Sequence, residues 1–148
     1  MSGKGALRRA CCCLFLVVMC GAACNGGRLV KSDTLYYLDA KTTSIVQTIE
    51  PKDMVQEGCK FVQVEVAKIV NPKLHSLTFE VRYQLGDEKT YLGSFSPFPA
   101  DNPGKFIVAT QGKVKNRGAI ILSLVMPDKI DANDTVQVTV KRMTFLRE

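Results

Sequence analysis

The alternation of hydrophobic and polar positions is clearest in residues 77–85, where it runs without a break. A period of two places one row of side chains in a core and the other row in water. The apolar row consists of Leu77, Phe79, Val81, Tyr83 and Leu85. The stretch therefore predicts a half-buried antiparallel strand, and such a strand needs partners to cover its apolar face.

Shorter runs of the same kind recur along the chain between turn signals. Eight strands are predicted in all, at residues 34–38, 43–50, 61–70, 77–85, 90–95, 106–110, 119–126 and 135–145. A short helical turn is predicted at residues 51–57, and no long helix. Short strands separated by turns are typical of a sandwich or small barrel. We expect an all-β fold, an immunoglobulin-like antiparallel β-sandwich of about seven to nine strands after an N-terminal signal segment.

Turns are predicted where a residue restricts the backbone or bonds to it. Asp39 can accept hydrogen bonds from the backbone that follows it, which indicates a turn between the first two strands. Asn71 and Pro72 indicate another, because proline keeps the preceding residue out of a helix. Three prolines within residues 96–104 exclude a helix or a central strand there. We expect that segment to be an ordered crossing loop.

The N-terminal segment has the character of a targeting signal. Lys4, Arg8 and Arg9 form a positive end, and residues 10–23 form an apolar run of 14 residues. A helix of that length spans about 21 Å, which is short of the roughly 30 Å hydrocarbon core of a bilayer. Residues 1–23 are therefore predicted to be a secretory signal peptide and not a transmembrane helix.

The end of this segment, Gly21-Ala22-Ala23-Cys24, resembles the lipobox of bacterial lipoproteins. The resemblance implies that Cys24 is lipidated, with palmitate-type acyl chains, and becomes the mature N-terminus. Members of that class usually carry leucine where this chain has Gly21. Cleavage without lipidation, giving a secreted soluble β-sandwich, and an uncleaved anchor therefore remain as alternatives. Residues 24–32 would then be the lipidated cysteine and a flexible tether, and residues 33–148 the β-sandwich domain.

The resemblance also implies a location. The expected site is the bacterial cell envelope, on its periplasmic or surface side, with the membrane contacted through the lipid anchor. Asn25 follows the cysteine, and an aspartate in that place tends to hold enterobacterial lipoproteins at the inner membrane. Its absence favours the outer membrane over the inner one.

The charge balance does not indicate nucleic-acid binding. Without Lys4, Arg8 and Arg9 the chain has 17 basic and 14 acidic residues, a balance of +3. Nucleic-acid proteins usually show a concentrated basic face with stacking aromatic residues. The densest basic run consists of Lys113, Lys115 and Arg117. It is interpreted as a solvated loop or as a contact for anionic lipid or polysaccharide.

The cysteines and the single histidine give little basis for a metal or catalytic site. Five of the six cysteines fall in the first 24 residues, which leaves Cys59 alone in the body of the chain. This spacing suits neither a disulfide framework nor a zinc site. Cys59 is expected to pack as a small buried residue, with pairing to Cys24 as the alternative if that residue is not lipidated. No cofactor is indicated.

His75 is expected to be a surface histidine on a turn. Asp128, Asp131 and Asp134 lie three apart, but they lack the ligand pattern of a calcium loop and are expected to form a solvated turn. No nucleophile motif is present either. We therefore assign no catalytic residue and expect a protein that is not an enzyme; an accessory enzyme with an unrecognised site is the less favoured alternative.

The proline-rich loop carries the most distinctive apolar residues. Phe95 and Phe98 are candidate partner contacts, together with the basic run. Phe98 either packs on the edge of the sandwich or is displayed to a partner. The function expected overall is that of a membrane-anchored envelope lipoprotein acting as a non-catalytic binding or structural module. Its partner would be another envelope protein or a saccharide, contacted through end loops or by strand addition.

Overall fold

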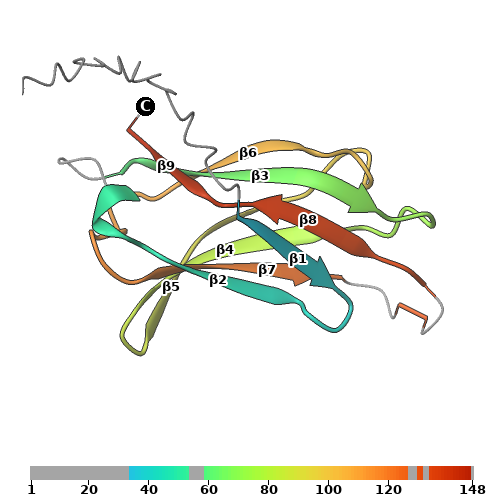
Figure 1. Cartoon of the computed structure of the whole chain (residues 1–148), viewed down its shortest axis with the longest axis horizontal. Helices are drawn as coiled ribbons and strands as arrows, with labels where there is room; N and C mark the ends of the chain where they lie inside the picture. The colour runs from blue at the N-terminus through green and yellow to red at the C-terminus, as the bar shows by residue number, and fades with distance from the viewer. Residues whose placement is uncertain (1–33, 54–58, 127–129, 132–133, 148) are drawn as a thin grey trace, which may run out of the picture. The chain divides into compact units, whose positions relative to one another are not determined.

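The computed structural model describes residues 34–53, 59–126, 130–131 and 134–147, and these form a domain of β-strands (Figure 1). The predicted signal peptide and Cys24 lie outside the described residues. One 3₁₀ turn, η1 (Pro51–Asp53), falls within the predicted helical turn. The strands are β1 (Leu35–Asp39), β2 (Ser44–Thr48), β3 (Phe61–Val70), β4 (Thr78–Leu85), β5 (Glu88–Phe95), β6 (Gly104–Ala109), β7 (Ala119–Val125), β8 (Gln137–Lys141) and β9 (Thr144–Leu146).

The strands form two antiparallel sheets that pack face to face (Figure 1). The first sheet has the order β1-β8-β3-β6, with β9 also paired to β3, and the second has the order β2-β7-β4-β5. The all-β sandwich predicted from the sequence is confirmed, and nine strands fall within the predicted range. An immunoglobulin-like strand arrangement stays a prediction.

The core lies between the sheets and is built from the predicted alternation. In and beside β4, Leu77, Phe79, Val81 and Tyr83 are buried, as expected for the apolar row. Their counterparts in the first sheet are alternate valines of β3 and of the β8 region, namely Val62, Val64, Val66, Val136, Val138 and Val140. All of these strands and their core belong to one compact unit, Ser32–Glu148.

The prediction of a single strand at residues 135–145 is wrong in one respect, because this segment forms two strands, β8 and β9. Val140 pairs with Val66 and Thr144 pairs with Gln63. Three residues of the C-terminal segment thus lie opposite two residues of β3. One extra residue of this kind is a β-bulge, which bends a strand and frees backbone groups from the ladder.

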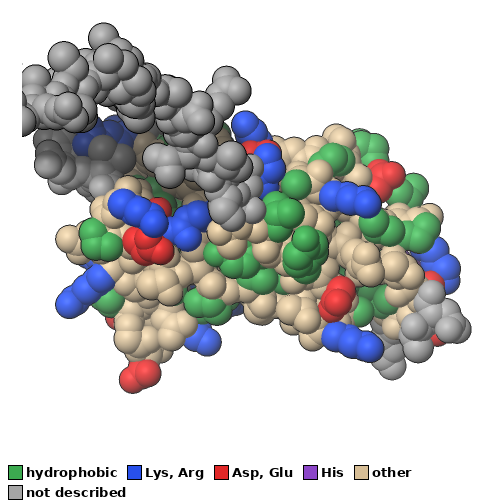
Figure 2. Space-filling view, viewed as in Figure 1, with side chains coloured by type: hydrophobic (Ala, Val, Ile, Leu, Met, Phe, Trp, Pro, Cys, Tyr) green, Lys and Arg blue, Asp and Glu red, His purple; other side chains and the backbone are tan. Residues whose placement is uncertain are grey.

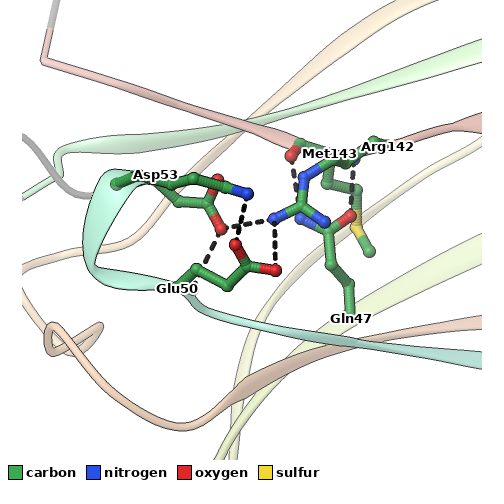
Figure 3. Close-up of polar contacts among 6 residues, drawn as sticks. Gln47, Glu50, Asp53, Arg142 and Met143 are labelled. Atoms are coloured by element: carbon green, nitrogen blue, oxygen red, sulfur yellow. Dashed lines mark hydrogen bonds and ion pairs between the residues drawn. The ribbon is translucent and has the colours of Figure 1, made fainter. Parts of the chain in front are cut away.

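The backbone groups of Met143, within the bulge, bond to the other sheet. The side-chain amide of Gln47, in β2, is 1% exposed and reaches Met143 across the core (Figure 3). Met143 N–H donates to Gln47 Oε1 at 2.7 Å, and Gln47 Nε2 donates to the Met143 carbonyl at 2.9 Å. Both backbone groups of Met143 are therefore hydrogen-bonded, and they connect the bulge to the other sheet.

Beside this bond, Arg142 forms an ion-pair cluster with the segment after β2. Its Nη2 lies 2.6 Å from Asp53 Oδ2 and 3.7 Å from Glu50 Oε1 (Figure 3). The Asp53 carboxylate also accepts from the Glu50 backbone N–H at 2.9 Å. The Asp53 carboxylate thus contacts both the Arg142 side chain and the backbone of Glu50.

The antiparallel order separates the connections into two ends. The β1–β2, β3–β4, β5–β6 and β7–β8 connections lie at one end, on the right in Figure 1, which we call the loop end. The β2–β3, β4–β5 and β6–β7 connections lie at the opposite end, where the C-terminus also lies. Phe98 and the basic run are consequently at opposite ends of the domain.

Candidate functional site

The loop end is the candidate binding site, because it displays Phe98. The side chain is 92% exposed, the largest exposed fraction of any large hydrophobic residue within the described ranges. Of the two alternatives for Phe98, packing on the sandwich edge is wrong, because the ring is exposed, and display to a partner stays a prediction. The neighbouring Pro97 is buried instead.

The loop that carries Phe98 is held in place on both sides of it. The Thr78 and Ser96 hydroxyls are hydrogen-bonded at 3.0 Å, and Asn102 N–H donates to the Pro99 carbonyl at 2.9 Å. A fixed backbone around an exposed aromatic ring lowers the entropy that is lost when the ring is bound.

A single buried amide joins this loop to the β3–β4 turn. Asn71 Nδ2 donates to the carbonyls of His75, at 2.8 Å, and of Ala100, at 3.3 Å. Its Oδ1 accepts from the His75 N–H at 3.0 Å. The same turn exposes Leu74, which adopts a positive φ of 53°. Two exposed apolar side chains thus stand on loops that share one anchor.

Phe95, the other aromatic candidate, is placed differently. Its ring is half-buried and stacks on Phe79 with a centroid distance of 5.0 Å and on Phe106 with a distance of 4.2 Å. Phe79 belongs to β4 and Phe106 to β6, so the stack closes the side of the sandwich where the chain crosses between the sheets. Phe95 therefore packs against the sandwich, at the end of β5 where the loop that carries Phe98 begins.

His75 makes a side-chain contact that the sequence does not indicate. Its Nε2 lies 3.0 Å from Asp134 Oδ2, and Lys73 Nζ contacts Asp134 Oδ1. The Asp134 side chain is only 6% exposed, so the expectations of a surface histidine and a solvated aspartate turn are wrong for these two residues. The hydrogen bond from Lys73 holds the pKa of Asp134 below its usual value, and His75 adds to this effect against the opposing effect of burial. Asp128 lies outside the described residues.

The cluster of Lys73, His75 and Asp134 connects the β3–β4 turn to the β7–β8 connection. His75 and Asp134 are 59 residues apart, and nothing in the local sequence of either residue indicates the contact. A shallow depression of about 430 Å³ also lies at this end, but His75 and Asp134 do not line it. Its lining residues are Ala40, Thr43, Leu124, Val125, Met126 and Ile130. This lining brings no ionisable side chain to the depression.

The open edges of the sheets form a second apolar area. Leu35 and Tyr37 of β1 and Val46 of β2 are exposed, and both strands are at the ends of their sheets. Figure 2 shows hydrophobic side chains over the middle of this face, where Figure 1 places β1 and β2. Edge strands with free backbone groups are where strand addition occurs.

The basic run lies on the β6–β7 connection, away from the loop end. Lys113, Lys115 and Arg117 are exposed, and the buried Val114 anchors the loop between them. The Arg117 carbonyl accepts a 2.7 Å hydrogen bond from the buried Tyr83 hydroxyl. The cationic side chains project from a loop whose backbone is fixed.

Cys59 is buried as predicted. Its thiol donates to the Phe61 carbonyl at 3.3 Å, and Thr110 Oγ1 donates to the Cys59 carbonyl at 2.6 Å. Burial raises the pKa of this thiol, against the smaller effect of the hydrogen bonds from its neighbours. A protonated and buried sulfur is poorly suited to nucleophilic chemistry.

The described structure shows no metal-binding cluster, and comparison with known proteins identifies no family. Within the described ranges, no group of three or more His, Cys, Asp or Glu side chains is placed to hold a metal ion. In that same part of the chain, no helix has the length and apolar character needed to cross a membrane. No protein family matches the chain, and no curated protein sequence is significantly similar to it.

Proposed function

We propose that the protein is a lipid-anchored lipoprotein of the bacterial cell envelope whose β-sandwich is a non-catalytic binding module. The observation that carries the proposal is the exposure of Phe98 on a loop fixed by Asn71 and by the Thr78–Ser96 hydrogen bond. Exposed aromatic residues on rigid supports are typical centres of protein contacts. The anchor is inferred from Gly21-Ala22-Ala23-Cys24, and Asn25 favours the outer membrane.

The partner is another envelope protein or a saccharide, bound at the loop end. Phe98 and Leu74 supply apolar area, and the polar backbone of their loops surrounds them. Strand addition at the β1 or β2 edge is the competing route, because those strands also expose apolar residues.

The anchor is tested by the intact mass of the mature protein, purified from the membrane fraction of its host. The proposal expects a chain that starts at Cys24 and is heavier by two or three acyl groups. A bare peptide mass in the soluble fraction would exclude lipidation and favour the secreted alternative.

The binding surface is tested by photo-crosslinking in intact envelopes, with a photoreactive phenylalanine analogue at a single position. The analogue at position 98 is expected to give one discrete crosslinked product. The same analogue at position 107 is the control, because Ile107 is also well exposed but lies in β6. A product from position 37 in β1 and none from position 98 would replace loop-end binding by strand addition.

A further inference from the structure

Cationic side chains gather at the end of the sandwich opposite Phe98. Lys60 N–H donates to the Leu146 carbonyl at 3.0 Å, and Thr110 N–H donates to the Lys60 carbonyl at 2.8 Å. These two bonds bring Lys60, the C-terminal segment and the β6–β7 connection side by side. We define the basic end by its exposed cations, Lys60, Lys113, Lys115, Arg117 and Arg147.

The charges of the basic end are not compensated within the described structure. No acidic side chain in the described ranges forms an ion pair with any of the five cations. Each of six other cations has at least one such pair, namely Lys52, Lys73, Arg82, Lys105, Lys141 and Arg142. The sequence around the loop explains this, since no Asp or Glu occurs between Asp101 and Asp128. The β4–β5 hairpin brings the exposed Asp87 and Glu88 to the same end, but they pair with none of the five cations, so the positive field is local to those five side chains.

The first described residue, Thr34, lies beside Arg142. The Thr34 carbonyl accepts from Arg142 N–H at 3.0 Å, and β1 runs from there toward the loop end. Nine residues separate Cys24 from Thr34. Such a segment reaches at most about 30 Å, and as a flexible chain it spans about 17 Å on average. An anchor at Cys24 would therefore keep the basic end close to a bilayer surface.

We propose that the basic end docks on anionic phospholipid headgroups and so directs the loop end, with Phe98, away from the membrane. The position of the bilayer in this proposal rests on the proposed anchor at Cys24. Each cation near an anionic membrane surface contributes about fivefold to partitioning. Tethering raises the local concentration of the domain, so a few such charges suffice to orient it.

The test uses the chain from Cys24 onward, coupled through Cys24 to a maleimide-bearing lipid in vesicles. The buried Cys59 is protected from the coupling. The sequence contains no tryptophan, so the tryptophan fluorescence comes only from the one residue that is introduced. Asn116→Trp places it in the basic loop and Phe98→Trp at the loop end. The readout is quenching of its fluorescence by a lipid with a spin-labelled headgroup, in phosphatidylcholine vesicles with or without phosphatidylglycerol.

In anionic vesicles, quenching at position 116 is expected to exceed that at position 98 by at least about twofold. The difference should vanish in pure phosphatidylcholine and in 1 M salt, where the screening length is about 3 Å. Replacing Lys113, Lys115 and Arg117 by glutamine should abolish it. The matched triple variant Lys41→Gln, Lys68→Gln and Lys105→Gln removes the same charge elsewhere and should keep it.

Equal quenching at both positions in anionic vesicles would overturn the proposal, as would a difference that survives in neutral vesicles. Suppression of the difference by dextran sulfate at a concentration that leaves the vesicles intact, combined with no effect of phosphatidylglycerol, would assign the basic end to an anionic polysaccharide instead. Because the coupling is chemical, none of these outcomes depends on whether the host lipidates Cys24. Failure of this proposal is thereby distinct from failure of the proposed anchor.

Discussion

The Gln47 side chain and the Met143 backbone form a reciprocal pair of hydrogen bonds between the two sheets. The arrangement resembles one rung of a β-ladder, with a side-chain amide in place of a second backbone. Both partners are buried, so neither Met143 group could turn to water if the amide were removed.

Gln47→Leu is therefore expected to lower the free energy of unfolding by about 2–4 kcal/mol, because it leaves a buried N–H and a buried carbonyl without partners. Urea denaturation of the purified domain measures the change. Ile45→Val, two residues earlier on the same face of β2, is the control and should cost about 1 kcal/mol. A Gln47→Leu variant as stable as the parent would show that the hydrogen bonds give no net stabilisation.

Gly118→Ala is expected to be far more damaging than Gly112→Ala, although both glycines have positive φ. At position 112 an added Cβ meets nothing within 4 Å, so only the left-handed backbone is penalised, by about 1 kcal/mol. At position 118, where φ is 103°, the Cβ would collide with the Gln84 carbonyl oxygen and the Tyr83 ring. We expect a loss of at least about 3 kcal/mol, measured by thermal denaturation of both variants. Similar losses would contradict the close approach of the β6–β7 loop to β4.

Phe98→Ala is expected to change the free energy of unfolding by less than about 0.5 kcal/mol, since the ring is almost fully exposed. Phe79→Ala, at the fully buried end of the aromatic stack, should cost about 3–5 kcal/mol. Chemical denaturation of the two variants gives the comparison. A large loss of stability in Phe98→Ala would mean that the ring is packed and that its display does not serve binding.

The Asp134 carboxylate is expected to stabilise the domain at neutral pH and not in acid. Its bonds to Lys73 and His75 hold its pKa below the ordinary value of 3.8, so the stabilisation is complete above that value and is lost as the pH falls through the lower, folded pKa. Asp134→Asn should therefore be less stable than the parent near pH 7 but similar to it in strong acid, by urea denaturation at each pH. Asp101→Asn, in the exposed β5–β6 loop, should be as stable as the parent both near pH 7 and in strong acid. A constant deficit for Asp134→Asn would show that its charge is not the cause.

The strands were predictable because their alternation is local. Phe61–Val70 was located to the residue, and most other ends were within two residues, since each core-facing row is visible in the sequence. The turn at Asp39 was predictable for the same reason, and the structure confirms its mechanism: Asp39 Oδ1 accepts from Lys41 N–H at 2.8 Å and from Thr42 N–H at 2.5 Å.

The contacts of the candidate sites were not predictable, because their partners are far apart in the chain. His75 contacts Asp134 only because folding brings the β3–β4 turn and the β7–β8 connection together. Gln47 and Met143 are 96 residues apart. One signal was available for the second pair: Gln47 interrupts a core-facing row between Ile45 and Ile49, and a polar side chain in such a position requires a buried partner.

The order of the strands also determines when the protein can fold. Among the described strands, only β4 and β5 are neighbours both in the chain and in a sheet. In the described structure, β1 pairs only with β8, and one side of β3 pairs with β8 and β9. Both of these strands lie within residues 137–146. Topologies dominated by such distant pairings fold in milliseconds to seconds. The first sheet therefore closes only after β8 and β9 have been synthesised, and until then β1 lacks the strand with which it pairs.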